Sequence, residues 1–152
     1  MSKTNPAGTI LALDLGQKRV GAAVCDQLLI TIKRLEPIKR SNWKQLLLDV
    51  RGLIVGFDAQ TLVIGLPLRL DGTKGDAATE AHATAVKFAK SLSIPVYLQD
   101  ERLTSTEAEE ALRSVGHQRH HIAELVDSES AAIILRDFLT SDPGHWLLVN
   151  KN

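Results

Sequence analysis

The segment Thr9-Ile10-Leu11-Ala12-Leu13-Asp14-Leu15-Gly16 decides the fold of this chain. An apolar run that is uninterrupted up to its end is typical of a strand buried on both faces, and therefore of a central strand. A carboxylate at the end of such a strand is costly to desolvate unless a cation or hydrogen-bond donors receive it. The glycine that follows suits a tight turn and a close approach by a phosphate. We therefore expect Asp14 to be the first of several acids that hold a divalent metal ion.

The residues around this segment predict an α/β domain. A second strand over 19–25 and a third over 29–35, ended by Pro37, follow at short intervals and suggest an antiparallel meander. Helical crossovers between the later strands favour parallel pairing, so we predict a mixed five-stranded sheet with helices on both faces. The later elements that we expect are a helix capped by Ser41 or Asn42 and closed by Gly56, a strand over 61–65, a helix over 76–92, a strand over 95–98, a helix over 104–116, a polar loop over 117–121 and a helix from near Asp127 to about Leu139.

Length and composition indicate one globular domain. The chain has 152 residues, of which 44% are apolar and 24% are charged. We expect a flexible tail over 1–8, a single domain over 9–142 and a C-terminal tail over 143–152, whose apolar residues could pack back on the body. No apolar run approaches the roughly 20 residues of a membrane helix, and no signal peptide is recognisable. Cytoplasm is the compartment that we expect, since the single cysteine, Cys25, can form no internal disulfide.

The formal net charge of the chain is zero, which argues against a protein that coats nucleic acid indiscriminately. A nuclease remains possible, because metal ions neutralise phosphate locally and basic residues can cluster on one face. No Ser-His-Asp or Cys-His arrangement suggests a side-chain nucleophile.

Two further acidic positions are candidates to join Asp14. Asp100 and Glu101 follow the last expected strand, and since side chains alternate across a strand, only one of them can face Asp14. Asp127 lies one helical turn before Ala131, on the apolar stripe of the last helix. Carboxylates are the ligands that hard divalent cations prefer. Each acid also has an ordinary structural explanation: Asp127 is a good helix N-cap, and Asp100 or Glu101 could pair with Arg102 or lie in solvent.

Basic residues near these acids are candidates to contact phosphates, although a solvated surface charge explains each of them equally well. They are Lys18, Arg19, Arg69, Lys74 and Arg102. The histidines at 117, 120 and 121 suggest zinc at first sight. Their spacing does not match a closed tetrahedral site and no cysteine accompanies them, so we expect a polar loop near the nucleic-acid backbone instead.

Five motifs occur in order between about Ile10 and Leu139. They are Leu11-Ala12-Leu13-Asp14-Leu15-Gly16 with Arg19-Val20-Gly21, then Val63-Ile64-Gly65-Leu66-Pro67-Leu68, then Asp71-Gly72, then Asp100-Glu101-Arg102-Leu103-Thr104-Ser105, then Val126-Asp127-Ser128 with Ser130-Ala131-Ala132. Together they resemble the YqgF family, also called RuvX, whose members are described as pre-16S rRNA nucleases and as Holliday junction resolvase-like proteins. Each motif alone is weak, whereas the ordered set is highly specific.

This resemblance implies an RNase H-like fold and a hydrolase that cleaves phosphodiester bonds with Mg²⁺ or Mn²⁺. It implies that Asp14, Glu101 and Asp127 hold the metal at the catalytic centre. It also implies a bacterial cytoplasmic protein that matures the 5′ end of 16S rRNA, with pre-16S rRNA and ribosome-assembly factors as partners; the alternative substrate is a Holliday junction. One departure is Glu124, which stands where many members carry a lysine just before the last acid.

Two rival functions stay open at this point. Asp14-Leu15-Gly16 also resembles the first phosphate loop of the actin, Hsp70 and sugar-kinase superfamily, but this chain is short for two such lobes and lacks a second glycine-rich phosphate motif. The other rival is a non-catalytic protein that binds rRNA or the ribosome-assembly machinery, because metal ligands alone do not prove turnover.

Overall fold

A computed structural model describes residues 8–28, 31–67, 75–100, 119–140 and 146–149, with side chains in the last helix from residue 129 onward. The predicted helix over 104–116 and the N-terminal tail up to residue 7 lie outside this range. The elements in chain order are β1 (Thr9–Leu15), β2 (Arg19–Cys25), β3 (Ile32–Lys39), α1 (Trp43–Phe57), β4 (Ala59–Leu66), α2 (Asp76–Ser91), β5 (Val96–Asp100), α4 (Arg119–Thr140) and β6 (Trp146–Leu148).

The strands form one mixed sheet in the order β3-β2-β1-β4-β5-β6. β1 pairs with β2 antiparallel and with β4 in parallel, and β5 also runs parallel to β4. β1 is central, and its residues Ile10 to Leu13 are completely buried, as their apolar run predicts. The predicted count of five strands is wrong, because Trp146–Leu148, expected only as part of a tail, pairs antiparallel with β5 as a sixth.

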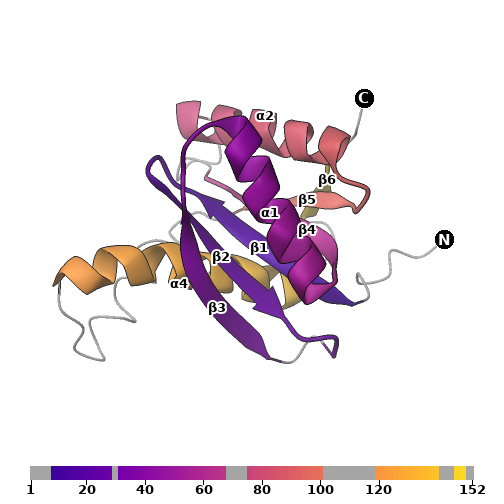
Figure 1. The fold of residues 1–152 in the computed structure, drawn as a ribbon, viewed down its shortest axis with the longest axis horizontal. Helices are drawn as coiled ribbons and strands as arrows, with labels where there is room; N and C mark the ends of the chain where they lie inside the picture. The colour runs from indigo at the N-terminus through magenta and orange to yellow at the C-terminus, as the bar shows by residue number, and fades with distance from the viewer. Residues whose placement is uncertain (1–7, 29–30, 68–74, 101–118, 141–145, 150–152) are drawn as a thin grey trace.

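Helices cover both faces of the sheet, which confirms the prediction (Figure 1). α1 and α2 pack on one face, where Leu11, Leu13 and Phe88 belong to the larger core. α4 crosses the other face, where Ile134 and Phe138 pack against Ile10, Ala12 and Val63 of the sheet. α2 approaches closely because the residues it buries include four alanines: Ala78, Ala81, Ala85 and Ala89. Within the described residues, no helix combines the length and the apolar character needed to cross a membrane.

Two predicted boundaries in the first half of the chain are wrong. β3 begins at Ile32 and continues through Pro37 to Lys39, because the ladder with β2 shifts register between the pairs at Leu35 and Ile38. Proline is tolerated at such an irregularity of an edge strand, where its missing N–H breaks no ladder bond. α1 begins as expected, with the Asn42 side chain accepting the Gln45 N–H at 2.8 Å. It ends at Phe57 rather than Gly56, with Asp58 as a left-handed C-cap.

The start of the last helix is also corrected. α4 begins at Arg119, so His120 and His121 lie in its first turn and not in a loop. Residues 119–126 contain neither proline nor glycine, and nothing in them stops a helix. Asp127 is therefore an internal helix position, and its interpretation as an N-cap is wrong.

Candidate active site

Asp14 lies at the end of β1, on the face of the sheet that α4 covers. Successive side chains of a strand point to opposite faces of the sheet, so every second residue shares a face, which we call the same parity. Ile10 and Ala12 pack in the core on the α4 side. Asp14, two residues further on, therefore has their parity and faces α4. It is half-buried, after four completely buried residues. Its ladder partner in β2 is Gly21, and the next position of β4 beyond the Leu13–Ile64 pair is Gly65. Asp14 is thus flanked on both sides by residues without a side chain.

The turn after Asp14 is held by several hydrogen bonds. The Gly16 N–H donates to the Asp14 carbonyl at 3.1 Å and to the Arg19 carbonyl at 3.0 Å. A Cβ at Gly16 would lie 2.5 Å from the Arg19 carbonyl oxygen, so only glycine fits without a shift of the backbone. The Arg40 guanidinium donates to the Gly16 carbonyl at 2.8 Å. The sequence thereby fixes the backbone that carries the candidate metal ligand.

A row of three residues crosses the sheet on the α4 side. Gly65 pairs with Gln99 of β5, so Asp14, Gly65 and Gln99 lie side by side on adjacent strands. Val63 and Tyr97 pack in the α4-side core, and alternation therefore assigns Gly65 and Gln99 to the same face as Asp14. Asp100 has the parity of Leu98, which packs in the opposite core. Asp100 consequently faces away from Asp14. Glu101 lies outside the described residues.

α4 brings the position of Asp127 to this face. Position 127 lies one turn before Ser130 and Ala131, both completely buried. The helix is attached to the edge strand β3 by Glu129, which accepts two hydrogen bonds from the Arg34 guanidinium, one of them from Nη2 at 2.9 Å. The hydrogen bond to Glu129 raises the pKa of Arg34 above its ordinary value. This bidentate pair lies two residues from Asp127 and fixes the helix over the sheet.

The predicted site residues fall into two groups. The side chains of Asp14, Lys18 and Arg19 are described, and the backbone of Asp127 is placed in α4. The predictions for Glu101, Arg69, Lys74 and Arg102 lie outside the described residues, as does the side chain of Asp127.

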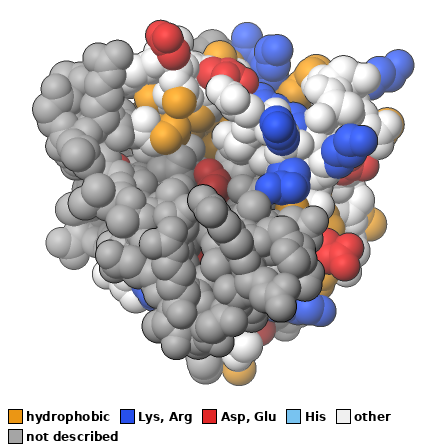
Figure 2. Space-filling model, turned by 90° about the vertical axis from the view of Figure 1, so that its left-hand side faces the viewer, with side chains coloured by type: hydrophobic (Ala, Val, Ile, Leu, Met, Phe, Trp, Pro, Cys, Tyr) orange, Lys and Arg blue, Asp and Glu red, His pale blue; other side chains and the backbone are white. Residues whose placement is uncertain are grey.

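Basic side chains do gather at the end of the sheet where β1 ends. Arg19 pairs in register with Lys39 of β3, and both have the parity of the α4-covered face. Lys18 and Lys39 are exposed and Arg19 is half-buried. Figure 2 shows Lys and Arg side chains collected on this side of the molecule. Lys39 was not predicted, because its place beside Arg19 depends on the register shift in β3.

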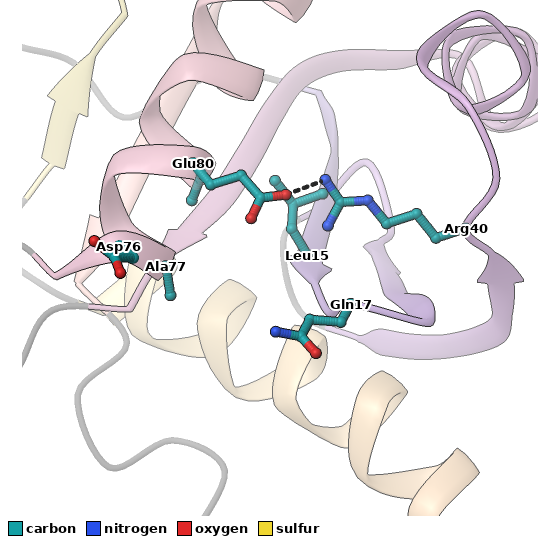
Figure 3. Close-up of a pocket in the computed structure, with 7 residues that line it drawn as sticks. Leu15, Gln17, Arg40, Asp76, Ala77 and Glu80 are labelled. Carbon is teal, nitrogen blue, oxygen red and sulfur yellow. Dashed lines mark hydrogen bonds and ion pairs between the residues drawn. The ribbon is translucent and has the colours of Figure 1, made fainter.

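A pocket of about 140 Å³ opens at the same end of the sheet, between the β1–β2 turn and the start of α2. Its lining includes Leu15, Asp76 and Glu80, and the Arg40 guanidinium crosses it to reach Glu80 at 2.8 Å (Figure 3). Leu15 packs with the core under α1 and α2. The pocket therefore lies on the face opposite Asp14, and Arg40 serves there as a structural cross-link.

The residues present fit a hard divalent cation. Asp14 supplies a carboxylate, and the buried Oε1 of Gln99, in the same row, has no hydrogen-bond partner. Oxygen donors of this kind are what Mg²⁺ and Mn²⁺ prefer. Among the described residues no three His, Cys, Asp or Glu side chains come together, but two of the three predicted ligand side chains lie outside that part of the chain. Gln99 was missed because only the register shows its relation to Asp14.

Comparison with known proteins gives one consistent result. A family model described as RuvX, Holliday junction resolvase, matches residues 8–141. A relative from Syntrophus aciditrophicus (strain SB), named "Putative pre-16S rRNA nuclease", is 38% identical over 130 residues, covering 86% of this chain and 87% of its own length. A relative of the same name from Gloeothece citriformis (strain PCC 7424) is 40% identical and covers 85% of each chain.

Among solved structures, T. thermophilus RuvC in complex with a Holliday junction substrate matches with a TM-score of 0.56 and 16% identity, over 93% of this chain and 99% of RuvC. A second structure of Thermus thermophilus RuvC matches with a TM-score of 0.53 and 14% identity. At such identity the likeness concerns the fold, and it confirms the predicted RNase H-like class.

Proposed function

This chain belongs to the RuvX family, and on that premise we propose that it is a metal-dependent nuclease that hydrolyses phosphodiester bonds of pre-16S rRNA. The observation that carries the proposal is the match to relatives named for this activity, at 38% and 40% identity over most of both chains. The position of Asp14 agrees with it, at the end of the central strand and under the helix that contains Asp127. The cytoplasmic location and the ribosome-assembly partners stay predictions.

Asp14, Glu101 and Asp127 hold the metal in this proposal. Asp14 is held by the rigid β1–β2 turn, Glu101 directly follows the end of β5, and Asp127 lies in α4 on the same side of the sheet. A bound Mg²⁺ or Mn²⁺ supplies a water of lowered pKa and stabilises the charge on the leaving oxygen. No side-chain nucleophile is needed, and the one cysteine, Cys25, is buried in the core.

The phosphate backbone of the substrate contacts the basic residues next to Asp14. Lys18, Arg19 and Lys39 supply positive charge at the end of the sheet where β1 ends. Such contacts position a nucleic acid without reading its sequence. The chain as a whole carries no net charge, so binding depends on this local patch.

A second candidate substrate is a branched DNA. The family model is described as a Holliday junction resolvase, and RuvC, which was solved with a Holliday junction, shares the fold. RNA and DNA offer the same phosphodiester bond to the metal site, so the choice depends on how the flanking duplex is held.

The deciding experiment is Mn²⁺-dependent cleavage of a precursor 16S rRNA fragment, with a Holliday junction assayed in parallel. We expect Asp14→Asn to lower the cleavage rate by more than about 100-fold, because outer contacts of a metal site alone account for about 10- to 100-fold. The matched control is Asp58→Asn, at an exposed left-handed C-cap that asparagine also tolerates.

Equal rates for the wild type and Asp14→Asn would rule out the metal-nuclease function. If the wild type binds the fragment in a gel-shift assay but cleaves neither substrate, the non-catalytic rRNA-binding role replaces it. Cleavage of the junction alone would favour the resolvase.

A further inference from the structure

Gln99 has a buried polar side chain whose amide oxygen forms no hydrogen bond within the described part of the protein. It is 4% exposed, and its Oε1 has no hydrogen-bond partner. An unpaired buried oxygen of this kind destabilises the fold, and an apolar side chain of the same shape would avoid that cost. Such a group calls for an explanation, and a partner that arrives with a ligand is one.

The backbone holds Gln99 firmly at one place. Its strand is paired on both sides, with Gly65 of β4 and with Trp146 of β6 as the register partners of Gln99. Its side chain has the parity of Tyr97, which packs under α4 against Phe138 with ring centroids 5.4 Å apart. Gln99 therefore belongs to the side of the sheet on which Asp14 lies.

On the sheet, the residue that lies between Gln99 and Asp14 is a glycine. The two residues stand two strand spacings apart, about 10 Å, and Gly65 between them places no side chain on the sheet. Metal–oxygen bonds of Mg²⁺ are only about 2.1 Å long, and this ion usually keeps several of its waters. The separation therefore suits a contact through a water of the ion better than a directly shared ion.

A second unpaired oxygen lies on the helix above this face. Ser130 of α4 is completely buried, and its Oγ has no partner. It lies one turn after position 127. Among the described residues, Gln99 and Ser130 are the two that have such an orphaned atom, one in the sheet and one in the helix that covers the Asp14 face.

We propose that Gln99 is a positioning residue of the metal site, whose Oε1 accepts a hydrogen bond from a water of the divalent cation that Asp14 holds. This inference rests on the proposed function, because it requires that Asp14 binds a cation. The amide orients that water, and its Oε1 gains a hydrogen-bond donor, which the protein's own described groups do not supply. Outer contacts of this kind typically change metal affinity by about 10- to 100-fold.

The test replaces Gln99 by methionine, which has a similar length and no hydrogen-bonding oxygen. Mn²⁺ binding is measured by titration calorimetry, and the Tm is measured in EDTA and in Mn²⁺. We expect Gln99→Met to be at least as stable as the wild type in EDTA, because an orphaned oxygen is removed. We expect its Mn²⁺ affinity to fall by about 10-fold or more, together with the rise in Tm that Mn²⁺ causes.

Two further variants make the test specific. Gln99→Glu keeps an acceptor oxygen at the same length, and we expect it to bind Mn²⁺ at least as tightly as the wild type. Thr61→Val is the matched control, since Thr61 is 2% exposed and has the parity of Gly65, but lies at the other end of β4. We expect unchanged Mn²⁺ affinity for this control.

Unchanged Mn²⁺ affinity in Gln99→Met, or weakened affinity in Gln99→Glu, would overturn the inference. Failure of the proposed function gives a different result, in which neither Asp14→Asn nor Gln99→Met alters Mn²⁺ binding. If Asp14→Asn alone loses Mn²⁺, the function stands and the role of Gln99 is rejected. Should Gln99→Met not fold, the result for Gln99→Glu decides.

Discussion

The carboxylate of Asp14 stands at the boundary between the most buried part of the sheet and a turn with little freedom. The four residues before it have no exposed surface, and the turn after it is tied by Gly16 and Arg40. A charge at this position gains nothing from the hydrophobic core and is expensive to desolvate. The proposed metal-binding role gives a reason for a carboxylate here, and the turn holds the backbone of Asp14 in one place.

Cys25 allows a prediction about pH at the scale of one residue. Burial raises the pKa of its thiol above the ordinary 9.0, although the Ile10 N–H donates to Sγ at 3.2 Å. In the unfolded chain the thiol ionises at lower pH than in the fold. The stability that this group contributes is therefore complete below about pH 8 and is lost as the pH rises through the unfolded pKa towards the folded value.

We accordingly expect urea unfolding to show a narrowing gap between the wild type and Cys25→Ala from about pH 8 to about pH 10, with a slope of at most about 1.4 kcal/mol per pH unit. The control is the same comparison between about pH 6 and 8, where the gap stays constant. Parallel curves up to pH 10 would contradict the prediction.

Some residues of the candidate site could be identified from the sequence alone, and others only from the structure. The place of Asp14 near the end of the central strand was predictable, because a charge that ends an apolar run is visible in the sequence alone. Its role as a metal ligand stays a prediction. Gln99 could not be predicted, because its place in one row with Asp14 becomes visible only from the register of β4 with β1 and β5. Lys39 likewise reaches Arg19 only through a register shift.

At the scale of elements, an ion pair links the edge strand β3 to the helix α4 close to position 127. Arg34 and Glu129 meet through two hydrogen bonds across 95 positions of sequence. The Arg34 side chain is 52% exposed and that of Glu129 only 13%, so solvent weakens the pair without removing it. We expect the pair to matter more for activity than for stability, because it helps to hold the helix that contains Asp127.

We expect Glu129→Gln to lower the free energy of unfolding by about 1 kcal/mol or less. Arg34→Lys tests the same contact, because lysine keeps the charge but cannot form the bidentate pair. Urea denaturation measures the stability, and Mn²⁺-dependent cleavage is expected to fall in both variants. A double-mutant cycle with no coupling between positions 34 and 129 would show that the pair does not hold the helix.

Element boundaries were predictable only where local chemistry sets them. Asn42 caps α1 through its own side chain, and the small residues of α2 face the sheet as their spacing predicts. Pro37 did not end β3, because a bulge in an edge strand absorbs it. Strand β6 was missed, because its three residues are too few to show the alternation of apolar and polar side chains that distinguishes a strand from an apolar tail.

For the molecule as a whole, the C-terminal strand completes the sheet next to the candidate site. β6 pairs with β5 along Tyr97, Leu98 and Gln99, and the buried Val149 donates its N–H to the Val96 carbonyl at 2.8 Å. Without this strand, β5 would present an unpaired edge, which promotes association between sheets.

Deletion of residues 146–152 is therefore expected to lower the free energy of unfolding by about 2 kcal/mol or more, which is what burial of a valine side chain alone contributes. Light scattering is expected to show aggregation at concentrations where the full chain stays dispersed. The control is Val149→Ala, which keeps the strand and loses only part of the burial. An unchanged unfolding curve for the deletion would show that β6 is dispensable.

The central claim concerns three segments far apart in the chain: the end of β1, the residue after β5 and the buried side of α4. The order of the sheet places β1 next to β4 and β4 next to β5, while α4 crosses the same face. The convergence of the three carboxylates stays a prediction, because the side chains of Glu101 and Asp127 lie outside the described residues.

The most direct test is a crystal of the protein soaked in Mn²⁺, with the ion located by its anomalous scattering. We predict a peak bonded to the Asp14 carboxylate at about 2.2 Å, with carboxylate oxygens of Glu101 and Asp127 completing its ligands. A structure in which these three carboxylates lie too far apart to share one ion, or in which the peak appears elsewhere, would contradict the account.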